Sequence, residues 1–205
     1  MKIVLCAGMP RAASKLVFQA TQRIVSFCGY PIETSLVVPP PVHKSEIPYS
    51  KELYRIGTLH PYAKEYMDTH SPLAITSYRD PRGVVASYRR LFHLGIDKEI
   101  AQLRRDIAYV FAYARYGALL LRYEYFTQDV VEMVQTISNY LFGVRLDSGA
   151  AHGIADECST DKVIAYHYTK IYRYTGSVWQ TDLSPEEIVA VEEASMEYMN
   201  QFSYE

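Results

Sequence analysis

The sequence predicts an α/β fold in three layers, in which a central parallel sheet is flanked by helices. Short apolar runs alternate along the chain with longer segments of helical periodicity, a pattern typical of parallel sheets with right-handed crossovers. The first run, 2–7, is continuously apolar after its lysine, as expected for a strand covered on both faces. We expect the 205 residues to form one domain, 1–205, with its own core.

The first unit consists of a strand, a short loop and a helix. From Leu16 the apolar residues fall on one helical face as far as Cys28, and Gly29 is placed to end that helix. Five prolines follow between Tyr30 and Ser50. Because proline suits neither a helix interior nor a central strand, this stretch predicts an ordered crossover loop.

Two more strands follow, each leading into a helix. Strands are predicted over 53–59 and 73–79, since both runs are bounded by turn residues. A short helix over 61–69 separates them, and a longer helix over 82–93 follows the second strand.

The clearest helical pattern runs to Gly117, and Asp97 is its expected N-cap. A buried strand over 118–124 and a helix over 129–141 come next. The stretch 149–178 has no strong period, so no regular element is predicted there.

The last helix has the sharpest start signal in the chain. Ser184 is placed as its cap, a proline follows at the first helical position, and Glu187 completes a capping box.

Composition narrows the class of protein. A net charge of −2 gives no general attraction to nucleic acid, so an anion site must be a local cluster of cations. The cysteines, Cys6, Cys28 and Cys158, are odd in number and lack metal-ligand spacing, which favours reduced thiols and the cytoplasm. No segment approaches the roughly eighteen apolar residues that a membrane span needs, so we expect no membrane partner.

The loop after the first strand is the first candidate site. It reads Gly8-Met-Pro-Arg-Ala-Ala-Ser-Lys15 and leads into a helix, whose first amides and dipole attract an anion. Arg11, Ser14 and Lys15 add two cations and a hydroxyl. The loop lacks the G-x-x-x-x-G-K-[ST] signature and the magnesium site that comes with it. It therefore predicts a phosphate or sulfate cradle without a metal.

This loop resembles the 5′-phosphosulfate loop of the sulfotransferases, commonly written P-[RK]-[ST]-G-[TS]-[TS]. Ala13 stands where that family usually has glycine, which narrows backbone freedom, and Lys15 stands where it often has a second threonine, which makes the cradle more basic. By this resemblance the cofactor-binding residues of the loop are Pro10, Arg11, Ala12, Ala13, Ser14 and Lys15.

A second motif resembles the 3′-phosphate motif of the same family. It reads Ser77-Tyr-Arg79-Asp-Pro81-Arg82, and Ser87 follows eight residues after Arg79. If Arg79 ends a strand and Ser87 lies about two turns into the next helix, both can reach one phosphate at the strand–helix corner.

Two further segments match the family in the expected order. Tyr123, in Leu121-Arg-Tyr-Glu-Tyr-Phe126, stands where the family has a tyrosine that packs on the adenine ring. Before Trp179 the resemblance implies a basic residue that also holds the 3′-phosphate. The family's usual Arg-Lys-Gly triplet is absent here, so two residues are candidates for this role. Arg173 is the first candidate and Lys170 the second.

The resemblance implies the P-loop-NTPase-like sulfotransferase fold and a reaction. The co-substrate would be 3′-phosphoadenosine 5′-phosphosulfate, its product adenosine 3′,5′-bisphosphate, and the acceptor a hydroxyl or amine of a small molecule or glycan. Sulfuryl transfer needs in-line positioning and charge neutralisation at the leaving oxygen, and no metal is implied. Arg11 would stabilise the departing phosphate, and Lys15 could donate a proton there, as a permanently charged arginine cannot.

The acceptor also needs a base, and two segments offer one. The family takes a histidine, or in some branches a glutamate, from a Lys-x-His-like segment before the 3′-phosphate strand. His60 lies nineteen residues before Arg79, although a threonine replaces the lysine. Glu46 keeps a nearby lysine, Lys44, but lies inside the proline-rich stretch. We favour His60 because imidazole titrates near neutral pH.

Two other functions compete with sulfuryl transfer. One is a P-loop-type kinase of small molecules, which the missing Walker lysine and magnesium carboxylate disfavour. The other is a nucleotide-binding module without catalysis, suggested by Ala13 and the uncertain base. The acceptor itself and the oligomeric state, a homo-oligomer included, are not encoded in any motif.

Overall fold

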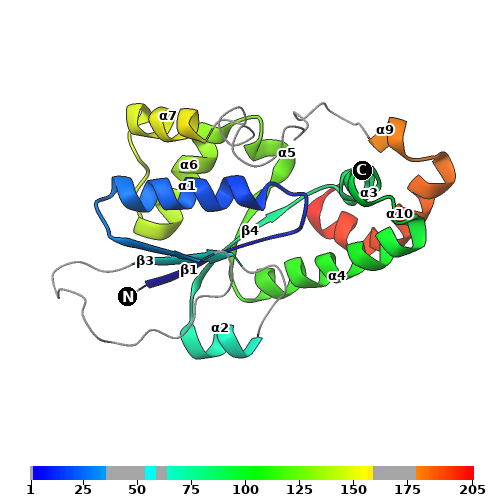
Figure 1. The fold of residues 1–205 in the computed structure, drawn as a ribbon, viewed down its shortest axis with the longest axis horizontal. Coiled ribbons are helices and arrows are strands. Elements are labelled where there is room, and N and C mark those ends of the chain that lie inside the picture. Colours follow the sequence, from blue (N-terminus) through cyan, green and yellow to red (C-terminus); the bar gives the residue numbers. More distant parts are fainter. Residues whose placement is uncertain (1, 36–53, 59–63, 159–178) are drawn as a thin grey trace.

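The structure, a computed structural model, describes residues 2–35, 54–58, 64–158 and 179–205. Its five strands form one parallel sheet in the order β2-β3-β1-β4-β5. Helices cover both faces of that sheet (Figure 1). The predicted three-layer α/β architecture is therefore confirmed.

The first part of the chain supplies four strands and three helices of the described fold. In chain order they are β1 (Lys2–Gly8), α1 (Ser14–Phe27), β2 (Ile32–Ser35), β3 (Tyr54–Thr58), α2 (Lys64–His70), β4 (Leu73–Tyr78) and α3 (Pro81–Phe92). The second part supplies the last strand and the remaining described helices. These are α4 (Ile96–Arg115), β5 (Leu119–Arg122), α5 (Tyr123–Phe126), α6 (Val130–Phe142), α7 (Ser148–Glu157), α9 (Trp179–Asp182) and α10 (Pro185–Phe202).

The two faces of β1 bury alternate residues. Val4 and Cys6 pack in a cluster with α1, α6 and α7, whereas Leu5 and Ala7 pack with residues of α2 and α4. This division follows from the two-residue period of a strand. It explains why the run carries no polar residue after Lys2, since neither face meets water.

A third cluster lies beyond the carboxyl ends of the strands, where α3, α9 and α10 gather (Figure 1). It joins α3, α4 and α10, and it includes Met9 and Ala12 from the loop after β1. The capping box of Ser184 and Glu187 starts α10 as predicted. No described helix is long and apolar enough to cross a membrane.

Four local predictions were wrong. Residues 32–35 form a strand rather than a loop; β2 is the edge strand beside β3, and Pro31 is tolerated because it precedes the strand. Gly95, not Asp97, is the N-cap of α4, and Asp97 lies in the first turn, where its charge complements the dipole.

The strand predicted over 118–124 ends early, because Tyr123 and Glu124 belong to the one-turn helix α5. The stretch predicted to lack regular structure begins inside α7. Asp147 caps that helix by accepting a hydrogen bond from Ala150 N at 2.9 Å.

The strand order places the predicted motifs side by side. Gly8 at the end of β1 pairs with Ser77 of β4, and Tyr78 pairs with Arg122 of β5. The carboxyl ends of these parallel strands therefore meet at one edge of the sheet, and the segments that follow them start there.

Candidate functional site

The loop after β1 is tightly held against β4. Met9 N donates a hydrogen bond to Ser77 O at 2.8 Å, and a Cβ added at Gly8 would lie 2.4 Å from Ser77 Oγ and 2.5 Å from Ser14 Cβ. Real Cβ atoms do not approach this closely, so position 8 requires glycine. Ser77 Oγ is buried and has no hydrogen-bond partner among the described residues.

Two loop residues adopt left-handed backbone conformations. Arg11 has a φ of 69° and Ala13 a φ of 53°, a region that costs a non-glycine residue free energy. Ala13 is also the N-cap of α1. The amides of Ser14 and Lys15 precede the first hydrogen bond of α1, which Leu16 N donates to Ala13 O at 2.9 Å. This turn therefore has donors for an anion despite the missing glycine.

Arg11 and Ser87 meet directly. Arg11 Nε donates a hydrogen bond to Ser87 Oγ at 2.8 Å, although the two residues are 76 positions apart. The Ser87 hydroxyl keeps its own proton for a further acceptor. The predicted 5′-phosphosulfate loop and the predicted 3′-phosphate helix thus share one polar junction.

Arg79 completes this junction from the end of β4. Its Nη1 donates to Arg11 O at 3.0 Å, and its Cζ lies 4.2 Å from the centroid of the Tyr123 ring. Tyr198, a buried residue of α10, donates from its hydroxyl to Arg79 O at 3.0 Å. Residues from three separate segments, the loop after β1, α5 and α10, therefore contact Arg79.

The other charged residues of the Arg79 motif are structural. Asp80 caps α3 by accepting from Arg82 N at 2.9 Å, and its own amide donates to Glu124 Oε1 at 2.9 Å. Arg82 is only 6% exposed, forms ion pairs of 2.9 Å with Asp80 and Glu192, and lies 4.4 Å from the Trp179 ring. These contacts brace the corner that presents Arg79.

The remaining predicted site residues divide into two groups. Lys15 lies exposed in the first turn of α1, and Tyr123 begins α5 instead of ending a strand. Four others lie outside the described residues: His60, Glu46, Arg173 and Lys170. Within the described part of the chain, no group of three or more His, Cys, Asp or Glu residues could hold a metal ion.

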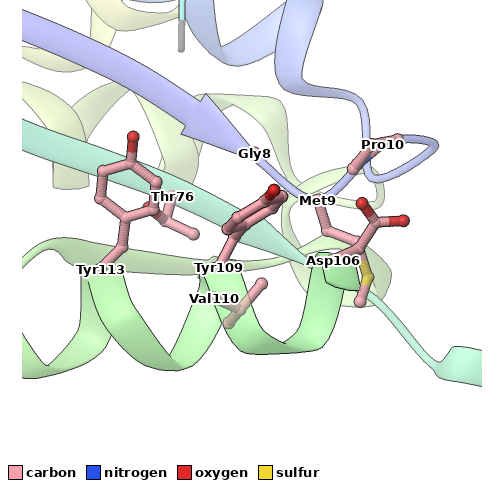
Figure 2. A pocket seen from close by; sticks show the side chains of 8 residues that line it. All are labelled: Gly8, Met9, Pro10, Thr76, Asp106, Tyr109, Val110 and Tyr113. Carbon is pink, nitrogen blue, oxygen red and sulfur yellow. The ribbon is translucent and has the colours of Figure 1, made fainter. Parts of the chain in front are cut away.

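Beside the loop lies a narrow hollow that the sequence did not predict. Figure 2 shows side chains rising from α4 toward the end of β1, and the lining residues are Gly8, Met9, Pro10, Thr76, Asp106, Tyr109, Val110 and Tyr113. Thr76 Oγ1 is buried there without a hydrogen-bond partner among the described residues. The hollow adjoins the loop on the α4 side of the sheet.

Asp106 is the charged residue of this hollow, and it is 2% exposed. It accepts hydrogen bonds from the Tyr88 hydroxyl and from Gln102 Nε2 at 3.0 Å. Burial and the bond to Asp106 raise the pKa of Tyr88, while the charge of Arg11 acts in the opposite direction. The sequence contains one indication that Asp106 is buried: it lies on the apolar face of the helix, between Leu103 and Val110.

Among the comparisons with known proteins, the comparison with solved structures finds similar folds, and the two sequence comparisons find no match. No protein-family model matches the sequence, and no curated protein matches it. The structure is similar to mouse sulfotransferase SULT7A1 complexed with PAP, with a TM-score of 0.69 and 15% identity over 97% of this chain and 83% of that one.

It is also similar to retinol dehydratase in complex with androsterone and PAP, with a TM-score of 0.63 and 14% identity over 97% of this chain and 80% of that one. A second structure of retinol dehydratase, with retinol and PAP, has a TM-score of 0.63 and 13% identity over 97% and 81% of the two chains. At such low identity the likeness concerns the fold. The chain described here has the three-layer fold of the PAPS-dependent sulfotransferases.

Proposed function

We propose that this protein transfers a sulfuryl group from 3′-phosphoadenosine 5′-phosphosulfate to an acceptor hydroxyl or amine by in-line displacement. The junction of Arg79, Arg11 and Ser87 is the observation that supports it most. The Arg11 guanidinium donates to the Ser87 hydroxyl, and the Arg79 guanidinium donates to the backbone carbonyl of Arg11. Segments predicted to bind opposite phosphates of one nucleotide are therefore in direct contact. Kinases of the P-loop type need no such second anion site.

The residues present suit this nucleotide. The loop Pro10, Arg11, Ala12, Ala13 and Ser14 would present the first amides of α1, those of Ser14 and Lys15, and the positive end of that helix to the 5′-phosphosulfate. Gly8 lies against Ser14 and Ser77 at the start of this loop, and a Cβ at position 8 would collide with both residues. Nothing larger than a hydrogen atom fits at that position.

The 3′-phosphate would be held by Arg79 and Ser87, with Arg173 as a further candidate. A guanidinium binds phosphate oxygens through paired, charge-assisted hydrogen bonds. Tyr123 would support the adenine ring, because its aromatic face is large and loses little rotamer entropy on binding.

When bound, the nucleotide supplies the sulfuryl group, and its 5′-phosphate is the leaving group. Arg11 neutralises the charge that develops on the leaving oxygen as the bond from sulfur to that oxygen breaks. Lys15 can deliver a proton there. His60 accepts the proton of the acceptor hydroxyl as the new bond to sulfur forms, and Glu46 is the alternative base.

The acceptor is proposed to be a small molecule. Retinol dehydratase has been crystallised with retinol and with androsterone, and a shared fold makes compounds of this size the first to test. A glycan is the second class.

Labelled co-substrate tests the proposal. The protein is incubated with 3′-phosphoadenosine 5′-[³⁵S]phosphosulfate and a panel of phenols, alcohols, amines and oligosaccharides, and transfer is measured by chromatography. We expect a labelled product and release of adenosine 3′,5′-bisphosphate. Tight binding of the bisphosphate without transfer would favour the non-catalytic module, and phosphorylation of an acceptor from ATP and magnesium would favour the kinase.

A further inference from the structure

The helix face that carries Ser87 has a glycine one turn earlier. Gly83 and Ser87 are four residues apart in α3, so they share one face. Arg79 precedes Gly83 by four residues, at the end of β4. Position 83 is therefore four residues from each of the two side chains assigned to the 3′-phosphate.

Gly83 is not required by the backbone. It lies inside a helix and has no positive φ, so an alanine there would ordinarily stabilise the protein by reducing the entropy of the unfolded chain. Gly153 in α7 is the matched case: it is helical, and a Cβ there would have nothing within 4 Å. Unlike Gly153, Gly83 has a neighbouring side chain close to the place where a Cβ would lie.

The space beside Gly83 is filled by the Arg79 guanidinium. A Cβ at position 83 would lie 3.1 Å from Arg79 Nε, 3.3 Å from Nη2 and 3.4 Å from Cζ. On the α5 side, the same guanidinium contacts the Tyr123 ring at 4.2 Å, and its Nη1 is bound to Arg11 O. A larger residue at position 83 would push the guanidinium away from α3 and disturb these contacts.

We propose that Gly83 is a positioning residue that sets the place of the Arg79 guanidinium and so determines selectivity for a nucleotide with a 3′-phosphate. This inference rests on the proposed function, since it assigns Arg79 to that phosphate. Gly83 acts through Arg79 and need not touch the nucleotide. Its side chain, a single hydrogen, lets the arginine lie against the first turn of α3.

The test compares Gly83→Ala and Gly83→Leu with Gly153→Ala. Calorimetry measures the affinity of each for adenosine 3′,5′-bisphosphate and for adenosine 5′-monophosphate, which lacks the 3′-phosphate. We expect Gly83→Leu to weaken bisphosphate binding about tenfold or more and Gly83→Ala about threefold, because small displacements of a preorganised group are costly. Monophosphate affinity should change less than about twofold, and Gly153→Ala should match the wild type.

A double variant tests whether the substitution at position 83 acts through Arg79 or through a general loss of structure. In the Arg79→Ala protein, Gly83→Leu should cause no further loss of bisphosphate affinity, since the group it displaces is gone. The Tm of Gly83→Ala should equal or exceed that of the wild type, which keeps the test valid even if the leucine variant does not fold.

Two results would overturn the role of Gly83 alone: equal losses for both nucleotides, or the full loss in the Arg79→Ala background. A wild-type protein that binds the two nucleotides equally would overturn the 3′-phosphate assignment, and the proposed function with it. Selective loss of bisphosphate binding, confined to proteins that keep Arg79, supports the inference.

Discussion

Replacing Arg79 by alanine should remove most of the binding energy that the protein gains from a 3′-phosphate. The substitution deletes a half-buried guanidinium that lies against the Tyr123 ring and donates to Arg11 O. Its backbone carbonyl, which accepts from Tyr198, is unchanged. The backbone of this corner should therefore stay in place while its cation disappears.

The expected loss follows from the hydrogen bonds at stake. A hydrogen bond to a charged group contributes about 1.5–3 kcal/mol, and an arginine can offer two to a phosphate. Because Arg79 is only half buried, solvent screening reduces their sum to about 2–3 kcal/mol. This corresponds to a loss of affinity of about 30- to 150-fold.

Isothermal titration calorimetry with adenosine 3′,5′-bisphosphate measures this loss, and adenosine 5′-monophosphate serves as the reference ligand. Arg145→Ala is the matched control, since Arg145 is an exposed arginine paired with Glu132 far along the chain from the site. Its affinity for both nucleotides should equal that of the wild type. Unchanged bisphosphate affinity in Arg79→Ala, with the protein folded, would refute the assignment of the 3′-phosphate site.

Three further predictions follow from other contacts. Ser87→Ala removes the acceptor of Arg11 Nε and should weaken bisphosphate binding about tenfold in the same calorimetric assay; Ser148→Ala, at the exposed start of α7, is its control. His60→Ala should lower turnover in the labelled-transfer assay and leave nucleotide affinity intact, whereas full activity would move the role of base to Glu46. The hydrogen bond from Arg89 lowers the pKa of Glu187 below its ordinary 4.5. A carboxyl of lowered pKa stabilises the fold above its unfolded-state pKa and loses that contribution as pH falls. The Tm of the wild type should thus drop more steeply below about pH 4.5 than that of Glu187→Gln, and parallel curves would contradict this.

The edge of the sheet where the site lies could be predicted, because parallel strands end on the same side. The loop after β1 and the corner after β4 were expected there, and the pairing of Gly8 with Ser77 makes them neighbours. How close the loop and the corner lie to each other along that edge could not be predicted from the sequence. It depends on the strand order, in which β1 and β4 are adjacent although β2 and β3 come between them in the chain.

The residues that sequence reasoning missed are those whose role depends on packing. Asp106 reads as one charged residue in an apolar stripe, and its burial beside the loop follows from how α4 lies under β4. Gly83 reads as a weak point in a helix, and only the position of the Arg79 side chain explains it. The edge strand β2 is too short to show a period, and it depends on its partner β3.

The amino-acid sequence by itself determined the local features of this protein: the alternation of strand and helix, the loop after the first strand, the Arg79 corner and the capped last helix. Each of these depends on the backbone preferences and polarity of neighbouring residues, which a linear pattern records. Only the tertiary structure decided that Arg11 reaches Ser87, that Arg79 lies over Gly83 beside Tyr123, and that Tyr198 holds the Arg79 backbone. Such contacts join residues far apart in sequence, and they arise from strand order and side-chain packing.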